Sequence, residues 1–186
     1  MNKAVFLDRD GVINRKAPEG DYVITWEEMH IFPGVAEAIA LLNRAEYRVI
    51  VVSNQRCVAK GLISVADLEM LHRRLAEHLS ASGATLDAIY YCPHENDPPC
   101  DCRKPQPGML LAAARDHQID LSVSWMIGDS MADIEAGRKV GCRTVLVASG
   151  DGFPASKPDL VAASLLEGVQ QVLVCQELAA GRQDNR

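Results

Sequence analysis

Short apolar runs alternate with longer helical patterns along most of this chain. The apolar runs predict β-strands near residues 3–8, 48–53, 86–91, 123–128 and 143–147. The patterns between them predict helices near residues 33–45, 64–82, 107–117 and 130–140. Regular alternation of this kind is typical of a parallel sheet whose strands are joined by crossover helices. The sequence therefore predicts an α/β fold with a Rossmann-like parallel sheet flanked by helices.

Residues at the ends of the predicted helices support these boundaries. Ser64, with Asp67 three residues later, is a typical N-terminal cap, and Gly83 supplies a stop for the same helix. A last helix is predicted to open at Ser164, after a short edge strand around residues 159–162. The sequence therefore predicts one further strand and one further helix toward the C-terminal end.

The length of the chain fits one buried core. At 186 residues and 48% apolar composition, the chain is too short for two comfortable cores. We expect a single domain over residues 1–180 and a polar tail over 181–186. Loops expected at 14–32, 54–63 and 92–106 exceed the about two to six residues usual for this architecture. None is large enough to be a separate cap domain.

The overall charge narrows the kinds of partner. A net charge of -6 disfavours a general nucleic-acid surface, which needs clustered Lys and Arg, and favours a small metabolite. The sequence lacks the roughly 20 consecutive apolar residues of a membrane span, and its N-terminus does not fit a signal peptide. We expect a cytoplasmic monomer with neither a membrane nor a nucleic acid as partner.

Acidic residues follow two of the predicted strands. Asp8 and Asp10 close the first apolar run, and Asp129 follows the fourth, with Asp133 one helical turn later. The carboxyl ends of parallel strands meet at one edge of a sheet, where open α/β proteins bind ligands. We therefore expect these carboxylates to lie close together, at a site for phosphoryl transfer.

Phosphate esters are anionic and poor electrophiles, so their hydrolysis requires a nucleophile, a proton for the leaving oxygen and positive charge. We assign Asp8 as the nucleophile, which would form an aspartyl-phosphate, and Asp10 as the general acid and base. Gly11 suits the tight turn that this arrangement needs. Ser53 can donate its hydroxyl to the phosphoryl oxygens, and Lys104 can place an ammonium there.

The same acids are candidates for a magnesium site. Mg²⁺ prefers oxygen ligands and keeps several waters. Asp8, the backbone carbonyl of Asp10, and Asp129 would supply three protein ligands, with Asp133 behind them. Each motif alone is more often structural, because Asp-x-Asp pairs are common in loops and Gly-Asp before a helix is often a cap. Their joint occurrence at predicted strand ends favours the catalytic interpretation.

Three of the six cysteines lie close together in the sequence, beside a histidine. Cys92, His94, Cys100 and Cys102 offer three thiolates and one imidazole, the donor set of a closed tetrahedral zinc site. Such a metal would fix the loop and hold residues 103–104 at the catalytic edge. The alternative is a mobile loop with four unliganded side chains. A disulfide framework is disfavoured because cytosolic thiols stay reduced.

The remaining histidines and two of the other cysteines are expected to have no catalytic role. The histidines fall in loop or helix-surface contexts, where we expect them to be solvated: His30, His72, His78 and His117. Cys142 and Cys175 have apolar surroundings in the predicted helices or at their ends, and are expected to be small core residues.

In their order, these motifs resemble those of the haloacid dehalogenase (HAD) superfamily of aspartyl-phosphate phosphatases. The matching segments are Asp8-Arg-Asp10-Gly-Val, Ser53-Asn54-Gln55, Lys104-Pro105 and Gly128-Asp129-Ser-Met-Ala-Asp133. The finer resemblance is to D,D-heptose 1,7-bisphosphate phosphatases and the related histidinol-phosphate phosphatases. It is carried by Leu7-Asp-Arg-Asp-Gly-Val-Ile-Asn14, Tyr22-Val23, Phe32-Pro-Gly34, Cys92-Pro-His94 and Cys100-Asp-Cys-Arg-Lys-Pro-Gln-Pro-Gly108.

The resemblance implies a Mg²⁺-dependent phosphatase with a structural Zn²⁺, acting on a sugar phosphate, foremost heptose 1,7-bisphosphate with release of the 1-phosphate. It further implies that Arg103 contacts the substrate and that Asn54 orients the transferring phosphate or leaving group. The chain departs from the heptose enzymes at Arg56-Cys57, where they usually carry Ser-Gly. This departure leaves the identity of the substrate open, but it does not change the expected chemistry.

Two other functions are weighed against this one. Histidinol phosphate is the alternative substrate, because both enzyme groups share the four motifs and the zinc loop. A non-catalytic, zinc-stapled module that binds a phosphate ligand is the alternative of a different class. Retention of both Asp8 and Asp10 argues against the module, because a binder does not need a general acid.

Overall fold

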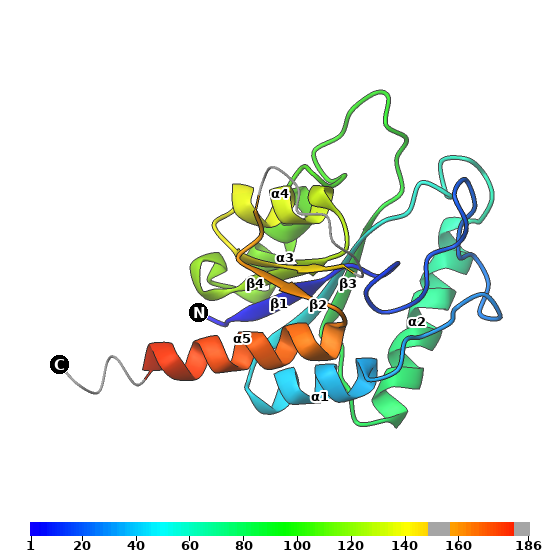
Figure 1. The fold of residues 1–186 in the computed structure, drawn as a ribbon. Coiled ribbons are helices and arrows are strands. Elements are labelled where there is room, and N and C mark those ends of the chain that lie inside the picture. The colour runs from blue at the N-terminus through cyan, green and yellow to red at the C-terminus, as the bar shows by residue number, and fades with distance from the viewer. Residues whose placement is uncertain (149–156, 181–186) are drawn as a thin grey trace.

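The computed structural model describes residues 1–148 and 157–180, and its strands form one parallel sheet (Figure 1). The strands are β1 (Ala4–Leu7), β2 (Arg48–Asn54), β3 (Ala88–Cys92), β4 (Trp125–Gly128), β5 (Arg143–Val147) and β6 (Leu160–Ala162). In the described residues their order is β3-β2-β1-β4-β5-β6, and every neighbouring pair runs parallel. The predicted tail over 181–186 lies outside the described residues.

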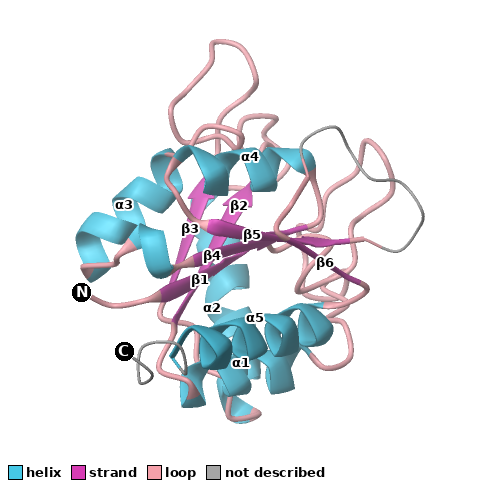
Figure 2. Ribbon diagram, turned by 60° about the vertical axis from the view of Figure 1, so that its left-hand side comes forward, coloured by secondary structure: helices cyan, strands magenta, loops and turns pink. Residues whose placement is uncertain are grey.

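Helices cover both faces of the sheet (Figure 2). They are α1 (Val35–Arg44), α2 (Val65–Ala81), α3 (Gly108–His117), α4 (Met131–Lys139) and α5 (Leu165–Ala180), with a 3₁₀ turn at Leu121–Val123. Helices α1, α2 and α5 pack on one face, and α3 and α4 pack on the other. The predicted α/β architecture is confirmed.

The buried core alternates between the two faces along each strand. In β1, Val5 and Leu7 face the side of α1 and α5, whereas Ala4 and Phe6 face α3 and α4. Because both faces are covered, the strands are apolar throughout rather than alternating with polar residues. This explains why the strands appear in the sequence as continuous apolar runs.

The boundaries differ from the predicted ones by one or two residues, with identifiable causes. The strand predicted from residue 123 begins at Trp125, because the side chain of Asp120 accepts the N–H of Ser122 and caps a 3₁₀ turn instead. Helix α1 begins after Gly34, whose φ of 80° lies in the left-handed region that favours glycine.

Three long loops meet at the carboxyl edge of the sheet. They span residues 8–34, 55–64 and 93–107, and in the described chain none contains a helix or an extended strand. The loop that precedes α3 projects beyond the sheet, drawn green in Figure 1. Long loops at this edge are where α/β folds recognise ligands. None of the described helices combines the length and the apolar character needed to cross a membrane.

Candidate active site

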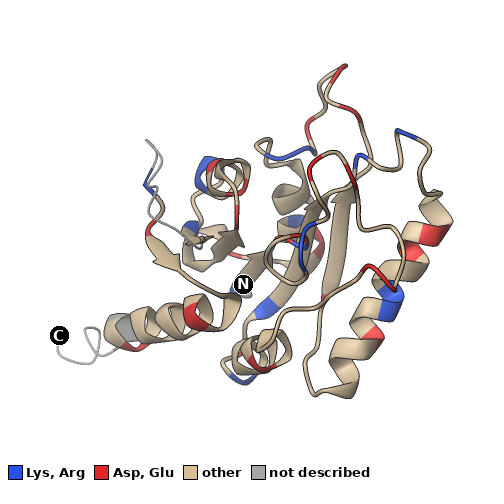
Figure 3. Cartoon of the chain, turned by 45° about the vertical axis from the view of Figure 1, so that its right-hand side comes forward, with Lys and Arg blue, Asp and Glu red and all other residues tan. Residues whose placement is uncertain are grey.

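The ends of β1, β2 and β4 border a cavity of about 190 Å³. Its lining residues come from these strand ends and the adjoining loops: Asp8, Asp10, Lys16, Ser53, Asn54, Lys104, Asp129, Ser130 and Asp133. Figure 3 shows acidic and basic residues together where the loops meet the end of the sheet. The cavity thus gathers every predicted catalytic and magnesium-binding residue, and its charged lining suits a polar ligand rather than an apolar one.

Lys104 lies at the bottom of the cavity between two carboxylates. Its Nζ is 2.8 Å from Oδ1 of Asp8 and 2.6 Å from Oδ1 of Asp133, and it donates to the carbonyl of Val52 at 2.7 Å. The side chain is 2% exposed. Burial alone would lower the pKa of Lys104, but the two carboxylates outweigh it and raise the pKa. Lys104 is therefore a buried ammonium.

Asp8 is buried among charges. Burial raises the pKa of Asp8 to about 7, opposed by Lys104 and reinforced by the carboxylates of Asp133 and Asp10. Its Oδ1 accepts from Lys104 and from the backbone N–H of Arg9 at 2.8 Å. A cation bound beside it would favour the carboxylate form, which a nucleophile needs.

The carboxylate of Asp10 accepts hydrogen bonds from three side chains. Arg9 donates from Nε and Nη2 at 3.2 and 3.1 Å, Asn14 from Nδ2 at 2.9 Å, and Gln55 from Nε2 at 2.9 Å. Gln55 also donates to Oγ of Ser53 at 2.7 Å, so it joins the residues after β1 and β2. These donors fix the carboxylate of Asp10 beside the cavity.

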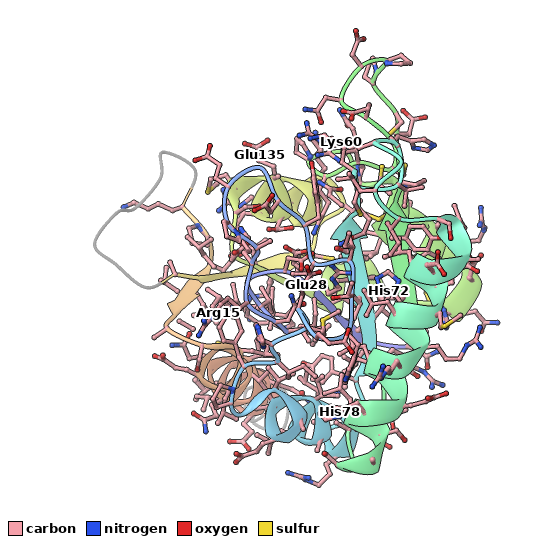
Figure 4. The ribbon with its side chains drawn as sticks, turned by 90° about the vertical axis from the view of Figure 1, so that its right-hand side faces the viewer. Arg15, Glu28, Lys60, His72, His78 and Glu135 are labelled. Atoms are coloured by element: carbon pink, nitrogen blue, oxygen red, sulfur yellow. The ribbon has the colours of Figure 1, made fainter. Side chains whose placement is uncertain are left out.

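The prediction that His72 is solvated is wrong. His72 is buried on α2 (Figure 4), and its Nε2 lies 3.0 Å from Nη1 of Arg9. A guanidinium only donates, so Nε2 is the acceptor and the imidazole is neutral. Burial, and then the charge of Arg9, lowers the pKa of His72 to about 3. Its spacing from Leu68 and Leu75 places it on the buried face of the helix.

Asp129 has one carboxylate oxygen in an ion pair and one without a partner. Its Oδ2 lies 2.6 Å from Nζ of Lys16, while Oδ1 is buried and has no hydrogen-bond partner in the described part of the chain. Burial raises the pKa of Asp129, which Lys16 opposes. An unpartnered buried carboxylate oxygen is a natural ligand for a hard cation.

The donor set fits magnesium. One oxygen from each of Asp8, Asp129 and Asp133 lies within 4.8 Å of the others. Asp133 has charged or polar neighbours at both oxygens, because Oδ1 forms an ion pair with Lys104, although without hydrogen-bond geometry, and Oδ2 accepts from the N–H and hydroxyl of Ser130. Asp8 and Asp129 therefore face the cavity with free acceptor capacity, while Asp133 supports Lys104 from behind.

Asn54 and Arg103 both form hydrogen bonds with main-chain atoms of the protein. The amide of Asn54 holds the main chain of Lys104, accepting its N–H at 3.0 Å and donating to its carbonyl at 3.1 Å. The guanidinium of Arg103 donates to the carbonyl of His94 at 3.5 Å, and Arg103 does not line the 190 Å³ cavity. Asn54 thus positions Lys104, and Arg103 borders the site from the loop before α3.

The four predicted zinc ligands converge. The Sγ atoms of Cys92, Cys100 and Cys102 lie 3.1 to 3.5 Å apart, and Nδ1 of His94 is 3.2 Å from Cys102 and 3.6 Å from Cys92. Ligands of tetrahedral zinc with bonds of about 2.3 Å are about 3.7 Å apart. The observed spacing is close to that value, so the cluster fits a zinc ion.

Arg56, one of the two residues at which the chain departs from the heptose enzymes, contacts the two other loops at the edge of the site. Nε of Arg56 donates to the hydroxyl of Tyr22 at 3.0 Å and lies 3.6 Å from Glu95. Cys57 is buried, and its thiol donates to Oε1 of Gln55. Both residues thus have structural partners, and Arg56 links the loop after β2 to the two other loops at the edge of the site.

Three residues of the site were missed in the sequence: Arg9, Lys16 and Gln55. Arg9 and Gln55 lie inside the recognised motifs, and their place beside Asp10 and Ser53 was the available signal. Lys16 carried no such signal, because its partner Asp129 is distant in sequence and no periodicity relates them.

Known proteins match this chain over most of its length. A family model described as HAD-hydrolase-like matches residues 101–168. The D-glycero-beta-D-manno-heptose-1,7-bisphosphate 7-phosphatase of Pseudomonas aeruginosa is 45% identical over 148 residues, covering 80% of this chain and 82% of that protein. The D-glycero-D-manno-heptose-1,7-bisphosphate 7-phosphatase of Thermosynechococcus vestitus is 41% identical over 195 aligned positions, covering 95% and 97%.

A solved structure matches the fold as well. The crystal structure of D,D-heptose 1,7-bisphosphate phosphatase from B. bronchiseptica, complexed with magnesium and phosphate, superimposes with a TM-score of 0.82. It is 35% identical, and the match covers 92% of this chain and 98% of that chain. The similarity therefore extends over nearly the whole chain.

Proposed function

Because this chain belongs to the heptose-1,7-bisphosphate 7-phosphatase family of HAD-like hydrolases, we propose that it removes the 7-phosphate from a D-glycero-D-manno-heptose 1,7-bisphosphate and leaves the 1-phosphate. The observation that carries the proposal is the buried Lys104, which pairs with Asp8 beside a small polar cavity that also contains Asp10 and Asp129. A phosphatase that works through an aspartyl-phosphate requires a carboxylate nucleophile, an acid and compensating positive charge at one point.

In the first step, a carboxylate oxygen of Asp8 attacks phosphorus. A bond forms between this oxygen and phosphorus, the bond from phosphorus to the ester oxygen breaks, and Asp10 gives the leaving oxygen its proton. Lys104 holds Oδ1 of Asp8 in place and supplies positive charge next to the phosphoryl oxygens, together with the hydroxyl of Ser53.

In the second step, water attacks the phosphorus of the aspartyl-phosphate. Asp10, now a carboxylate, takes a proton from that water, and the bond from Asp8 to phosphorus breaks to release inorganic phosphate. The hydrogen bonds from Arg9, Asn14 and Gln55 keep the Asp10 side chain next to the cavity.

Magnesium would be held by Asp8, the backbone carbonyl of Asp10, and Asp129. When bound, it neutralises charge on the phosphoryl oxygens that develops during transfer. The unpartnered Oδ1 of Asp129, noted among the described residues, supports this assignment. Asp133 would hold Lys104 and remain behind the metal ligands.

Zinc would be held by Cys92, His94, Cys100 and Cys102 in a structural site. The support is the spacing of the four donor atoms. Because Lys104 follows Cys102 by two residues, an ordered zinc loop would fix where Lys104 and Arg103 lie relative to β2.

The test is phosphate release with Mg²⁺ from both anomers of the heptose 1,7-bisphosphate and from histidinol phosphate, measured side by side. Asp8→Asn provides the blank. We expect kcat/KM for one heptose anomer to exceed that for histidinol phosphate by about a hundredfold or more, equivalent to about 2.7 kcal/mol. Preference for histidinol phosphate would overturn the substrate assignment. Binding without turnover of any phosphate ester would overturn the enzymatic one.

A further inference from the structure

We propose that Lys16 is a specificity-determining residue that binds the second, non-transferred phosphate of the substrate; this rests on the proposed function. Lys16 lies on the loop between β1 and α1, outside the segments that match the four HAD motifs in the sequence. Neither the reaction chemistry nor the magnesium ligands described above require it.

Lys16 lines the 190 Å³ catalytic cavity and two further spaces. One is a pocket of about 800 Å³ whose lining comes from the 15–30 segment and Leu62, and the other, of about 490 Å³, also has Gly11 and Asp129 in its lining. In the described part of the chain, Lys16 is the residue that the 800 Å³ pocket and the catalytic cavity have in common. A phosphoryl group bound at Asp8 leaves the larger pocket for the rest of the substrate, so Lys16 lies at the junction.

The backbone around Lys16 is held in place. Gly11 N–H donates to the carbonyl of Asn14 at 2.7 Å, and Arg15 N–H donates to the carbonyl of His30 at 2.9 Å. The side chain of Asn14 donates to Asp10 and to the carbonyl of Arg15, both at 2.9 Å. The loop therefore directs residue 16 back toward the catalytic carboxylates.

Gly11 leaves the space that the Lys16 side chain needs. A Cβ on Gly11 would lie 1.8 Å from Oδ2 of Asp129 and 2.9 Å from Cε of Lys16. The ion pair therefore occupies the space beside a glycine whose φ of 95° already disfavours other residues. This close packing distinguishes Lys16 from a freely solvated surface lysine.

The ammonium of Lys16 has donors to spare. It carries three N–H groups, and the ion pair with Asp129 at 2.6 Å uses one of them. The side chain is 52% exposed, so a ligand in either space can reach it. Lys16 can thus keep its contact with Asp129 while it binds an anionic group of the substrate.

The lining of the larger pocket carries charges of both signs. Arg15, Lys16 and His30 line it together with Asp21 and Glu28, and Figure 4 shows Arg15 and Glu28 on the loop in front of the sheet. The carboxylate of Glu28 is engaged, because Oε2 accepts the backbone N–H groups of Ile24 and Thr25 at 3.0 Å. Lys16 is the cation of this lining that also borders the catalytic cavity, so a second phosphate of the substrate can pair with it at that junction.

The experiment compares Lys16→Gln with the wild type on heptose 1,7-bisphosphate and on heptose 7-phosphate. Lys3→Gln removes the same charge at the opposite edge of the sheet and serves as the control. We expect Lys16→Gln to lower kcat/KM for the bisphosphate by about tenfold or more, mainly through KM, and to lower kcat/KM for the monophosphate by a several-fold smaller factor. Lys16→Arg should recover part of the loss.

Binding measurements separate this inference from the proposed function. The two sugar phosphates are titrated calorimetrically, with Mg²⁺, into Asp8→Asn and into Asp8→Asn with Lys16→Gln. Loss of the bisphosphate's advantage in the double variant supports the inference, even if the wild type fails to turn the heptose over. Equal losses for both ligands, a weakened Mg²⁺ affinity that explains the loss, or no loss at all would each overturn it.

Discussion

The guanidinium of Arg9 lies 3.0 Å from Nε2 of His72 and also holds the carboxylate of Asp10. Arg9 is only 1% exposed, so its charge is compensated within the protein rather than by water. His72 and the carbonyl of Val23 accept its remaining hydrogen bonds. The orientation of Asp10 therefore depends on α2 as well as on its own loop.

The first prediction concerns the pH dependence of stability at His72. Its pKa is about 3 in the folded protein and about 6.5 when unfolded. A lowered folded pKa means that its contribution is fully present above pH 6.5 and is lost as the pH falls toward 3. At pH 5 the folded state should have lost about 2 kcal/mol from this group.

Urea denaturation of the wild type and of His72→Gln between pH 7.5 and 5 measures this term. The wild type should lose about 2 kcal/mol relative to the variant over that range. The difference between the two proteins is needed because Asp8, whose pKa is raised to about 7, contributes with the opposite sign. His78→Gln, at an exposed position of the same helix, is the control. A wild-type curve parallel to that of His72→Gln would refute the buried neutral imidazole.

The second prediction concerns the buried charge of Lys104. Lys104→Met removes the partner of both Asp8 and Asp133 and leaves two carboxylates without compensation. Unfolding free energy should fall by about 3 to 5 kcal/mol, and kcat should fall by about a hundredfold or more. Lys139→Met, an exposed lysine that contacts the neighbouring carbonyl of Pro105, is the matched control. Unchanged stability in Lys104→Met would show that the ion pairs are not formed in solution.

The elements of the fold and the convergence of the motifs could be predicted because they depend on local patterns. Helix and strand periodicity identified the sheet, and the parallel arrangement then brought Asp8, Ser53 and Asp129 to one edge. The comparisons confirm the family resemblance that the motifs indicated. Strand ends are reliable because apolar runs stop where the chain leaves the core.

Contacts that depend on loop paths could not be predicted in the same way. Lys16 reaches Asp129 only because the residues after Gly11 fold back over the end of β1. His72 carried a usable signal, since it shares the helical stripe of Leu68 and Leu75, but its polarity suggested a surface position. Its burial is explained by the guanidinium of Arg9, a partner from the distant β1 loop.

The third prediction concerns zinc. The protein purified without chelators should contain about one zinc ion per chain, bound by the three thiolates and the imidazole. Cys102→Ser should lose it, together with much of the activity, because residues 93–107 would no longer hold Lys104 in place. Elemental analysis and proteolysis within this loop measure the two effects. Cys175→Ser, outside the cluster, should retain metal and activity, and wild-type protein without zinc would contradict the assignment.

The fourth prediction concerns the space beside Gly11. Gly11→Ala places a methyl group 1.8 Å from Oδ2 of Asp129, so Asp129 and Lys16 must both move. Because Asp129 is a proposed magnesium ligand, Mg²⁺ affinity should fall by about tenfold or more, measured by calorimetry.

Gly141→Ala is the control, since its φ is also positive, at 82°, and no heavy atom among the described residues lies within 4 Å of the added Cβ. That variant should lose about 1 kcal/mol of stability and keep its Mg²⁺ affinity. Equal Mg²⁺ affinities in the two variants would contradict the prediction, because Asp129 would then bind the ion equally well with or without the added methyl group at residue 11.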